Sequence, residues 1–529
     1  MSKELGLQKI KILIACLGIS FAVKAQSDFK QDSYILTKNL WKDTSASTNI
    51  KITPKDSIQL RWLPLLNKLQ YVQEHPYNWN DGAMVPAKGW QQLLRVGLHA
   101  QWKFIEIQIA PEMVLAQNQL FDELTIEIDN NPVTIRDYYR FYNFIELPER
   151  MGNASYNRLS WGQSYIKLHF KNWKIGLSNE NKWWGPAQRN ALLLSNTAAG
   201  FPHVSIATEK PIESKIGKFN VEVIAGKVTN GGWAPPNSYA AFRGNALYNP
   251  KEDKQRIING FNLSYQPKWT QNLTLGVEQM YMQYEKDMLL WQDYLPIKNV
   301  ISRIPDDGPK KPIIMTAFYL NYTMPEVQTT IYGEFGWNLP NTTFRNWFVQ
   351  PDKGYASTWG IKKIFPSKHQ YYWELLGELT QVQLLTVADQ FTTGIPPSWY
   401  LGSNVRQGYT HDGQLLGAGV GPGGSSQTVE FNWRKNKNRI GITTERRIHN
   451  ADYYQYAFVG SHDFRRFYTD FITTLKIDWQ FNKYQIGPRL SYMQTNNYEW
   501  NLFQTGNFYF IPGQDKQQFM LQFNLSYAL

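Results

Sequence analysis

The sequence predicts an all-β fold, a transmembrane antiparallel β-barrel, and three observations lead to this prediction. The last eleven residues alternate strictly between apolar and polar side chains. Aromatic residues make up 15% of the 529 residues. Beyond the N-terminal region, no segment has the roughly 20 consecutive apolar residues that a membrane helix requires, and the mean hydropathy is −0.46.

The C-terminal run is the clearest strand. Apolar residues occupy every second position from Phe519 to Leu529, and polar residues such as Gln522 and Asn524 alternate with them. Because successive side chains of a strand point to opposite faces, one face is suited to lipid and the other to a polar lumen. Runs with the same period recur at 94–98, 105–109, 166–170, 219–223, 261–265, 273–277, 373–379 and 475–479.

The pieces between these runs are of two lengths. Short turn-forming pieces such as 266–268 join some of them, as hairpins require. Longer pieces rich in Gly, Pro and Asn lie at 229–251, 291–312, 338–355 and 394–426. This asymmetry is typical of short periplasmic turns and long outer loops.

Two stretches, 111–122 and 132–145, favour short helices. In the second, Pro132 precedes apolar residues at helical spacing, and proline is common in the first turn of a helix. We expect these stretches to form a plug or a periplasmic cap near 111–145.

The N-terminus predicts export. Lys3, Lys9 and Lys11 precede an apolar stretch over 12–23, and Ala25 precedes a cleavage position, the layout of a secretory signal. We expect residues 1–25 to be removed and 26–529 to form a single barrel domain. A lipoprotein signal ending at Cys16 is the alternative, but it leaves almost no hydrophobic region before the cysteine. Because Cys16 is the only cysteine, disulfides are excluded from the mature chain.

Composition leaves alternatives open. The 31 Tyr, 28 Phe and 20 Trp suit aromatic girdles at the membrane interfaces, but a soluble sandwich or propeller that binds sugars could also use them. The net charge of +12 could serve lipid phosphates, an acidic polysaccharide or only solvent. We expect no nucleic-acid partner.

The sequence contains no recognisable catalytic motif that would support an enzymatic function. The eight histidines form no H-E-x-x-H, no G-x-S-x-G elbow occurs, and the glycine-rich 417–424 contains a proline that disfavours the helix of a phosphate loop. Neighbours in a strand point to opposite faces, so the adjacent pair His411 and Asp412 is interpreted as incidental. We therefore expect no catalytic residue, no metal and no cofactor.

The most unusual local cluster is 179–190, which contains Trp183, Trp184, Arg189 and Asn190. Indole faces beside hydrogen-bonding side chains are the composition expected where a sugar ring stacks. A membrane-interface anchor, or packing within a loop, would use the same residues. Composition alone leaves both interpretations open.

Around this cluster the sequence resembles the Wzi family of capsule-assembly outer-membrane proteins. The clearest matches are Leu147-Pro148-Glu149-Arg150, Trp183-Trp184-Gly185-Pro186 and Tyr409-Thr410-His411-Asp412. Further matching blocks lie at 77–84, 110–112, 162–164, 176–182, 189–196, 200–203, 258–260, 332–335, 407–408 and 413–419. The chain departs from the family pattern at Ala187, often a glycine, and at Leu529, where barrels usually end on an aromatic residue.

The resemblance implies a barrel of about 18 strands in the cell outer membrane, with loops that close the outer mouth and helices on the periplasmic side. It implies a lectin-like, non-enzymatic role in capsule assembly, in which a monomer inserted in outer-membrane lipid holds exported polysaccharide at the cell surface. The candidate polysaccharide-binding residues are Trp183, Trp184, Arg189, Asn190, Tyr409 and His411. A pore for oligosaccharides or other solutes is the alternative, and an outer-membrane hydrolase is a third hypothesis.

Overall fold

The computed structural model describes residues 58–77, 79–122, 132–235, 238–288, 312–338, 354–367, 371–384, 398–458, 466–500 and 515–528. The expected signal peptide, and most of the expected loops at 291–312 and 338–355, lie outside these residues. Among the described residues, no helix is both long enough and apolar enough to cross a membrane.

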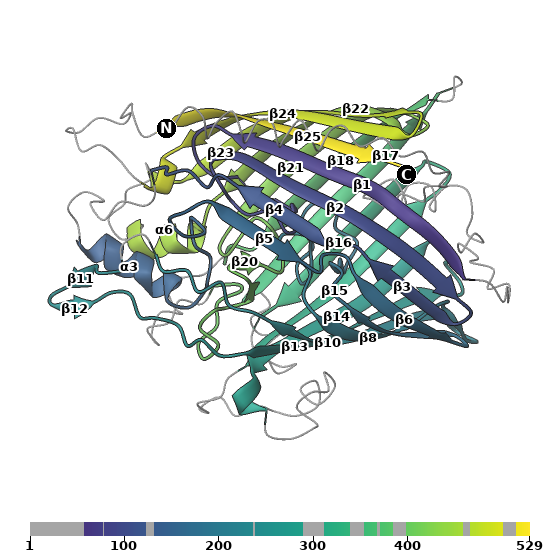
Figure 1. The fold of residues 1–529 in the computed structure, drawn as a ribbon, viewed down its shortest axis with the longest axis horizontal. Helices are drawn as coiled ribbons and strands as arrows, with labels where there is room; N and C mark the ends of the chain where they lie inside the picture. Colours follow the sequence, from purple (N-terminus) through teal and green to yellow (C-terminus); the bar gives the residue numbers. More distant parts are fainter. Residues whose placement is uncertain are drawn as a thin grey trace.

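The described strands form one large antiparallel sheet that closes on itself (Figure 1). The first half of the sheet contains β1 (Gln59–Val72), β2 (Gly89–Trp102), β3 (Ile105–Ile109), β4 (Glu112–Ala116), β5 (Tyr156–Ser160), β6 (Tyr165–Phe170), β7 (Trp173–Ser178), β8 (His203–Thr208), β9 (Ile212–Glu213), β10 (Gly217–Val228), β13 (Arg256–Pro267) and β14 (Leu273–Tyr284). The second half contains β15 (Ile313–Met324), β16 (Thr329–Trp337), β17 (Tyr355–Pro366), β18 (Tyr371–Gln381), β21 (Ser425–Lys435), β22 (Asn438–Ile448), β23 (Thr469–Phe481), β24 (Tyr484–Asn496) and β25 (Lys516–Tyr527).

These segments make 18 crossings of the wall, because β3 and β4, β5 and β6, and β8 and β9 are each consecutive pieces of one crossing. The last strand closes the barrel: β25 pairs with β24 on one side and with β1 on the other, from Leu65 opposite Tyr527 to Val72 opposite Met520. The prediction of an antiparallel barrel of about 18 strands is confirmed.

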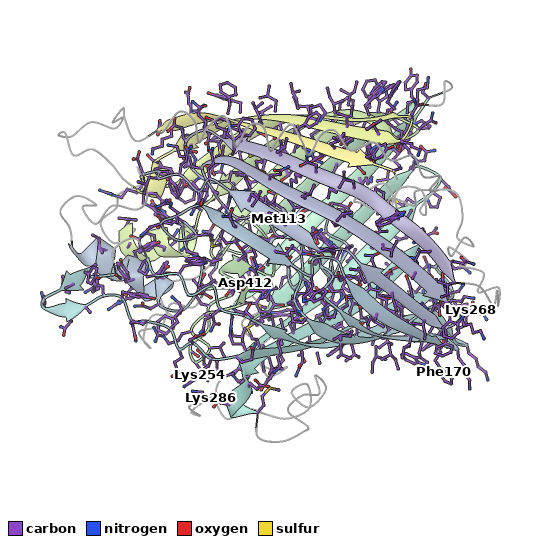
Figure 2. The ribbon with its side chains drawn as sticks, viewed as in Figure 1. Met113, Phe170, Lys254, Lys268, Lys286 and Asp412 are labelled. Atoms are coloured by element: carbon purple, nitrogen blue, oxygen red, sulfur yellow. The ribbon has the colours of Figure 1, made fainter. Side chains whose placement is uncertain are left out.

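The barrel is inside out compared with a soluble β-protein. In β25 the apolar Phe519 and Leu521 are 52% and 47% exposed, whereas the polar Gln518 and Gln522 are 1% and 7% exposed. All the predicted strand runs lie in strands of the barrel wall, and the same alternation is clear in β6 and β23. Figure 2 shows the outward side chains along the wall. An apolar outer face and a polar inner face are what a lipid surround requires, so a soluble sandwich or propeller is excluded.

The two ends of the barrel differ. Short turns, such as the one at Lys103 between β2 and β3, lie at the end where the C-terminus is found, and exposed aromatic residues such as Trp102, Phe170 and Phe481 lie beside them (Figure 1). The described parts of the long connections lie at the other end. In bacterial barrels the short turns face the periplasm, so the long-loop end is the outer mouth.

The helices are at that outer mouth. The described helices are α3 (Pro132–Tyr142) and α6 (Ala451–Phe458), with short 3-10 turns η1 (Glu285–Asp287) and η6 (Tyr498–Trp500). α3 confirms the helix expected within 132–145, but the helix expected over 111–122 is wrong, because β4 runs there and pairs with both β2 and β5. α3 and α6 lie at the long-loop end (Figure 1), which favours a plug over a periplasmic cap for the elements expected near 111–145. Two small hairpins, β11 (Ala241–Phe242) with β12 (Asn245–Ala246) and β19 (Thr410–His411) with β20 (Gln414–Leu415), belong to the long loops.

Candidate functional site

The loop between β7 and β8, residues 179–202, turns into the barrel. Its backbone is held by carboxylates on the inner faces of two strands of the wall. Glu334 of β16 accepts hydrogen bonds from the N–H groups of Ala187 and Leu192, at 2.9 and 2.8 Å. Glu378 of β18 accepts from the N–H groups of Gln188, Arg189 and Asn190, at 2.7 to 3.1 Å. Inward carboxylates therefore replace the strand partners that this loop lacks.

Gly185 shows how closely the loop approaches the wall. Its φ is +81°, a conformation that side chains disfavour, and a Cβ there would lie 2.2 Å from Oε1 of Glu334. A glycine is therefore required in the Trp-Trp-Gly-Pro motif. The motif fits the loop against an inner carboxylate.

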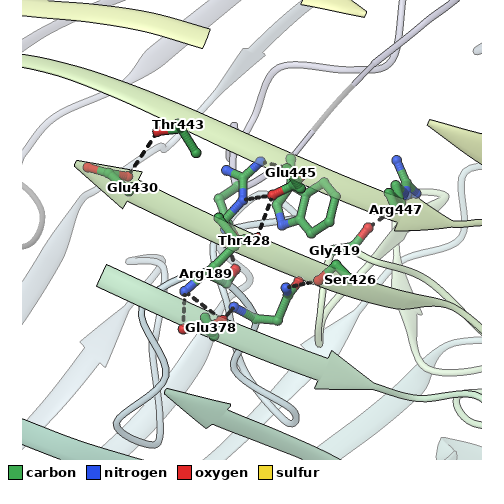
Figure 3. Close-up of polar contacts among 12 residues, drawn as sticks. Arg189, Glu378, Gly419, Ser426, Thr428, Glu430, Thr443, Glu445 and Arg447 are labelled. Carbon is green, nitrogen blue, oxygen red and sulfur yellow. Dashed lines mark hydrogen bonds and ion pairs between the residues drawn. The ribbon is translucent and has the colours of Figure 1, made fainter. Parts of the chain in front are cut away.

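Arg189 extends the anchorage to β22 (Figure 3). Its guanidinium donates to Glu445 at 2.8 and 3.3 Å and to the hydroxyl of Tyr77 at 2.7 Å. It also lies 4.3 Å from the ring centroid of Trp79. The Arg189 pKa is raised by Glu445 and Tyr77 against the opposing effect of burial, so this cation stays charged in place.

The paired tryptophans differ in exposure. The Trp184 indole is 2% exposed and donates to Glu222 of β10 at 2.9 Å, beside Lys182, which contacts the same carboxylate at 2.8 Å. The Trp183 indole is half-buried and donates to the carbonyl of Ala187 at 3.0 Å. Since β10 and β22 lie on well-separated parts of the closed sheet, the loop spans the lumen from wall to wall.

A second loop segment, 398–424, packs onto the first. The Tyr400 hydroxyl donates to the carbonyl of Leu192 at 2.8 Å and accepts from the N–H of Ala418 at 3.0 Å. The N–H of Ser195 donates to the carbonyl of Leu416 at 2.9 Å. The two distinctive sequence blocks thus meet in space, and together we call residues 179–202 and 398–424 the plug.

Tyr409 and His411 lie inside the plug. Tyr409 is fully buried and stacks on Tyr400, with 6.0 Å between the two ring centroids. Nδ1 of His411 accepts from the N–H of Thr229 at 3.1 Å, and Nε2 lies 3.2 Å from Asp412. This arrangement suits a neutral imidazole, and burial lowers the His411 pKa to about 4.

The structure therefore brings the six predicted site residues into one inner assembly. Asn190 is also fully buried, and its amide donates to the hydroxyl of Ser426 at 3.1 Å. Only Trp183 and Arg189 keep appreciable exposed surface. Their contacts make them anchors of the plug, and burial of the other four disfavours direct stacking of a sugar on them.

A cavity of about 310 Å³ opens at the outer mouth above the plug. Its wall is formed by α3, the β19–β20 hairpin and the ends of several loops. Its aromatic lining consists of Phe121, Tyr138, Phe141, Tyr142, Tyr468, Tyr498 and Trp500, and its polar lining includes His75, Glu149, Gln414, Arg447, His449, Asn450 and Glu499. We call this the outer-mouth cavity.

Arg447 is the cation of this cavity. Its guanidinium lies 5.0 Å from the Trp79 ring, so Trp79 contacts both Arg447 and Arg189. Within the described chain, Arg447 forms no ion pair, and its polar contacts are the carbonyls of Gly419 and Val420, both at 3.4 Å. Such long contacts leave donor capacity for a ligand.

The histidines of the cavity belong to a polar chain at its base. His449 contacts Asp470 of β23 at 2.5 Å and stacks on Tyr468 at 3.8 Å. Thr495 of β24 donates to the same aspartate at 2.7 Å and lies 3.1 Å from Nε2 of His75. Burial lowers the His75 pKa to about 4, so His75 is neutral at physiological pH.

This cavity has no local signal in the sequence. Its lining comes from segments near 75–86, 138–149, 413–422, 447–450 and 498–500, which only barrel closure brings together. Backbone strain was not visible in the sequence either: Asn497, Glu499 and Trp500 all have φ between 53° and 55°, and such residues cluster at functional sites. Within the described ranges, no group of three or more His, Cys, Asp or Glu side chains is arranged to hold a metal ion.

Comparison with known structures shows the same fold in the Wzi barrel. The structure of Wzi, an outer membrane protein involved in group 1 capsule assembly in Escherichia coli and a carbohydrate binding β-barrel, is similar with a TM-score of 0.56 at 10% identity, over 88% of this chain and 84% of that one. OccAB2 of Acinetobacter baumannii has a TM-score of 0.40 at 10% identity, over 90% and 98% of the two chains. OccK7 of Pseudomonas aeruginosa has a TM-score of 0.38 at 9% identity, over 89% and 99%. No curated protein matches the sequence.

A family model shows the relationship at the level of sequence. The model of the capsule assembly protein Wzi matches residues 88–482, a range that includes both plug segments and most of the barrel wall. With the inside-out barrel and its closed outer mouth, this match settles the assignment: the chain is an outer-membrane β-barrel that belongs to the Wzi family of capsule assembly proteins.

Proposed function

We propose that this protein is a lectin-like, non-enzymatic component of capsule assembly that holds exported polysaccharide at the cell surface, and that the polysaccharide binds in the outer-mouth cavity. The observation that carries the proposal is the chemistry of this cavity at the outer end of a plugged barrel. Because one chain lines the whole cavity, a monomer would suffice.

The cavity lining suits a sugar. Aromatic rings offer flat apolar faces, and Arg447, Glu149, His449 and Asn450 offer charged and neutral hydrogen-bonding groups around them. Tyr138 is a partly exposed ring, and its hydroxyl donates to Glu149 at 2.7 Å, which fixes both side chains. Pockets that bind small ligands combine apolar walls with a few placed polar groups and begin at roughly 300 Å³.

Family membership supports the same role. The E. coli Wzi barrel is described as carbohydrate binding, and the present chain shares its fold and its family. In this chain, the Trp-Trp-Gly-Pro motif serves the plug, so we assign polysaccharide contact to the cavity above it instead.

The plug supports retention over transport. The lumen is crossed by a loop whose backbone N–H groups are bound to Glu334 and Glu378 on the wall. Opening a pore would leave those carboxylates and N–H groups without partners, which costs roughly 1–3 kcal/mol for each group. We therefore expect the wild-type protein to give no large stable conductance in planar bilayers, and such conductance would favour the pore instead.

The experiment that tests the proposal compares two arginines that share the Trp79 ring. Arg447→Gln removes the cavity cation, which forms no ion pair within the described residues, and Arg189→Gln removes the plug cation, which is paired with Glu445. We expect Arg447→Gln to weaken binding of the cell's own capsular polysaccharide about tenfold at unchanged stability, since hydrogen bonds to a charged group contribute about 1.5–3 kcal/mol.

Arg189→Gln should do the reverse, with lower stability and unchanged binding per folded molecule. Binding is measured on detergent-solubilised barrels whose folded fraction is known from the heat-dependent shift on gels. Equal affinity of Arg447→Gln and wild type would contradict the assignment to the cavity. Release of shortened glycan during the assay would contradict the non-enzymatic role.

A further inference from the structure

The barrel wall has a gap in its strand pairing on the outer half. β7 and β8 are only six residues long each, whereas β10, which follows them in the sheet, has twelve. The pairing of β6 with β7 ends at Tyr165 opposite Ser178. Beyond that point the chain of β7 turns inward to form the plug, so residues 156–164 have no neighbouring strand on that side.

The deeper part of this edge is covered by the plug. The N–H of Asn179 donates to the carbonyl of Ser164 at 2.9 Å, and its side-chain amide donates to the carbonyl of Gly162 at 3.1 Å. Gln163 and Asn181 exchange two further hydrogen bonds, at 2.9 and 3.1 Å. From residue 162 towards the periplasmic end, the plug therefore supplies hydrogen-bond partners to this edge.

The outer part, β5, is open. Within the described chain, the backbone of Tyr156–Ser160 pairs only with β4, so the groups that point away from β4 form a free sheet edge. The outward side chains beside it are unusually exposed: Leu159 is 75% and Trp161 73% exposed. Val429, which is flanked by the long strands β18 and β22, is 54% exposed. We call this free edge, with Leu159 and Trp161, the notch.

On the lumen side of the wall, an ion pair closes the notch. Arg158 of β5 forms an ion pair with Asp412 at the tip of the β19–β20 hairpin, and the N–H of Asp412 donates to the carbonyl of Thr229, just beyond β10, at 3.0 Å. Asp412 is labelled in Figure 2, near the long-loop end of the barrel. The neighbouring Gly413 and Gln414 line the outer-mouth cavity, so this hairpin separates the notch from the cavity.

Register places the notch in the outer leaflet. Tyr156 pairs with Ala116, which pairs with Gln91, one residue from the exposed Trp90, whose ring contacts Tyr71 at 5.1 Å. These aromatics mark the outer interface. Ser160 lies four residues further along, about 13 Å at the usual rise and so roughly 9 Å deeper at a tilt of about 45°.

This position defines the chemistry of an occupant. Hydrocarbon chains cannot satisfy free backbone N–H and C=O groups, and open sheet edges do not persist in contact with acyl chains. The outer end of the edge, at Tyr156, lies at the depth of the linkage region of a lipid, where amide, ester and hydroxyl groups join the head to the chains. The flanking Leu159 and Trp161 continue the lipid-facing surface of the barrel, so the rest of the occupant must be apolar.

We propose that the notch binds a glycolipid of the outer leaflet. Its amide, hydroxyl and ester groups hydrogen-bond the free edge of β5, and its acyl chains pack on Leu159 and Trp161. A second copy of this chain is a poorer occupant. Two copies inserted in one membrane run β5 in the same sense along the membrane normal, so they cannot form the antiparallel edge pairing seen in the rest of the sheet. This site is separate from the polysaccharide cavity and does not depend on it.

The test is site-specific photocrosslinking with a benzophenone amino acid at Leu159 in the full-length protein. The matched control carries the same probe at Val429, which points to lipid at a similar distance from the outer end of its strand. Both variants are inserted into phosphatidylethanolamine vesicles with and without lipopolysaccharide, and also irradiated in native outer membranes. Only the folded band is analysed, by mass and glycan staining.

We expect at least fivefold more lipopolysaccharide adduct at position 159 than at position 429, in the vesicles and in native membranes. Vesicles contain no capsule, so this outcome is independent of polysaccharide binding. A yield at position 159 no higher than at 429, including none at either, overturns the proposal. An adduct at 159 with a second copy of the chain, or with another protein, as the main product also overturns it.

Discussion

The plug and the outer-mouth cavity lie next to each other at the same end of the barrel, yet their polar groups differ in how completely they are hydrogen-bonded. In the plug, each anchoring carboxylate is matched by donors from the loop, as with Glu378 and three consecutive N–H groups. In the cavity, Arg447 forms no ion pair with a described residue and has only long contacts to carbonyls. Polar groups whose hydrogen bonds are all made within the protein stabilise its structure, whereas polar groups with unused hydrogen-bonding capacity are available to a ligand. We therefore propose that the plug closes the barrel and that the cavity binds the ligand.

The largest effect is expected from Glu378→Ala in the plug. It leaves the N–H groups of Gln188, Arg189 and Asn190 and the hydroxyl of Tyr332 without their acceptor. We expect a loss of about 3–5 kcal/mol in the free energy of unfolding, together with intermittent conductance. Urea unfolding in micelles and planar-bilayer recording measure both. An unchanged free energy of unfolding, together with no conductance in the bilayer, would contradict the role of Glu378 in anchoring the plug.

The second effect concerns pH and the plug histidine His411. Its folded pKa of about 4 lies below the unfolded value of about 6.5, so the neutral form stabilises the fold. This contribution is fully present above pH 6.5 and is lost as the pH falls from 6.5 towards 4. We expect the difference in stability between pH 7 and pH 4.5 to shrink by on the order of 2 kcal/mol in His411→Gln. An identical pH dependence of variant and wild type would show that this histidine is not buried as described.

The third effect separates the two tryptophans of the motif. Trp184→Phe removes the donor to the partly buried Glu222, whereas Trp183→Phe removes a hydrogen bond of a half-buried indole to a carbonyl. We expect losses in unfolding free energy of about 1.5–2 kcal/mol for the first and about 0.5–1 kcal/mol for the second. Neither should change polysaccharide binding per folded barrel. If either variant lost polysaccharide binding but kept the stability of the wild type, the motif would be a binding site and not only an anchor of the plug.

The smallest effect tests a ring of the cavity. Tyr138 is partly exposed and lies on α3, so Tyr138→Ala removes a stacking face. We expect polysaccharide binding to weaken about threefold to tenfold, since an aromatic contact contributes about 0.5–1.5 kcal/mol. Tyr138→Phe is the control, because it keeps the ring and removes only the hydroxyl bonded to Glu149. Equal weakening by both variants would assign the effect to the hydroxyl and not to stacking.

The barrel was predictable from sequence because its signal is local. Alternation such as that of Phe519 and Gln522 reports a strand and its two faces directly. Pro132 correctly predicts α3. The helix predicted over 111–122 is wrong, since strand pairing of Glu112–Ala116 on both edges outweighs local helical preference.

The site was not predictable in the same way. The 179–190 cluster has the composition of a sugar site, but the partners of this loop, Glu222, Glu334 and Glu378, are single residues on distant strands. Their inward position is visible only once the register is known. The cavity likewise collects side chains from segments that lie hundreds of residues apart, for example Tyr138 of α3 and Arg447 of β22. The resemblance identified the family, and we propose a contact surface other than the one that the composition of the motif suggests.

The most direct measurement is a structure of the folded barrel with an oligosaccharide of the cell's own capsule. We predict sugar density in the outer-mouth cavity, with a ring on Tyr138 and a hydrogen bond from Arg447, and an unmoved plug. Density stacked on Trp183 or on Arg189 in an opened plug, with the cavity empty, would contradict the account.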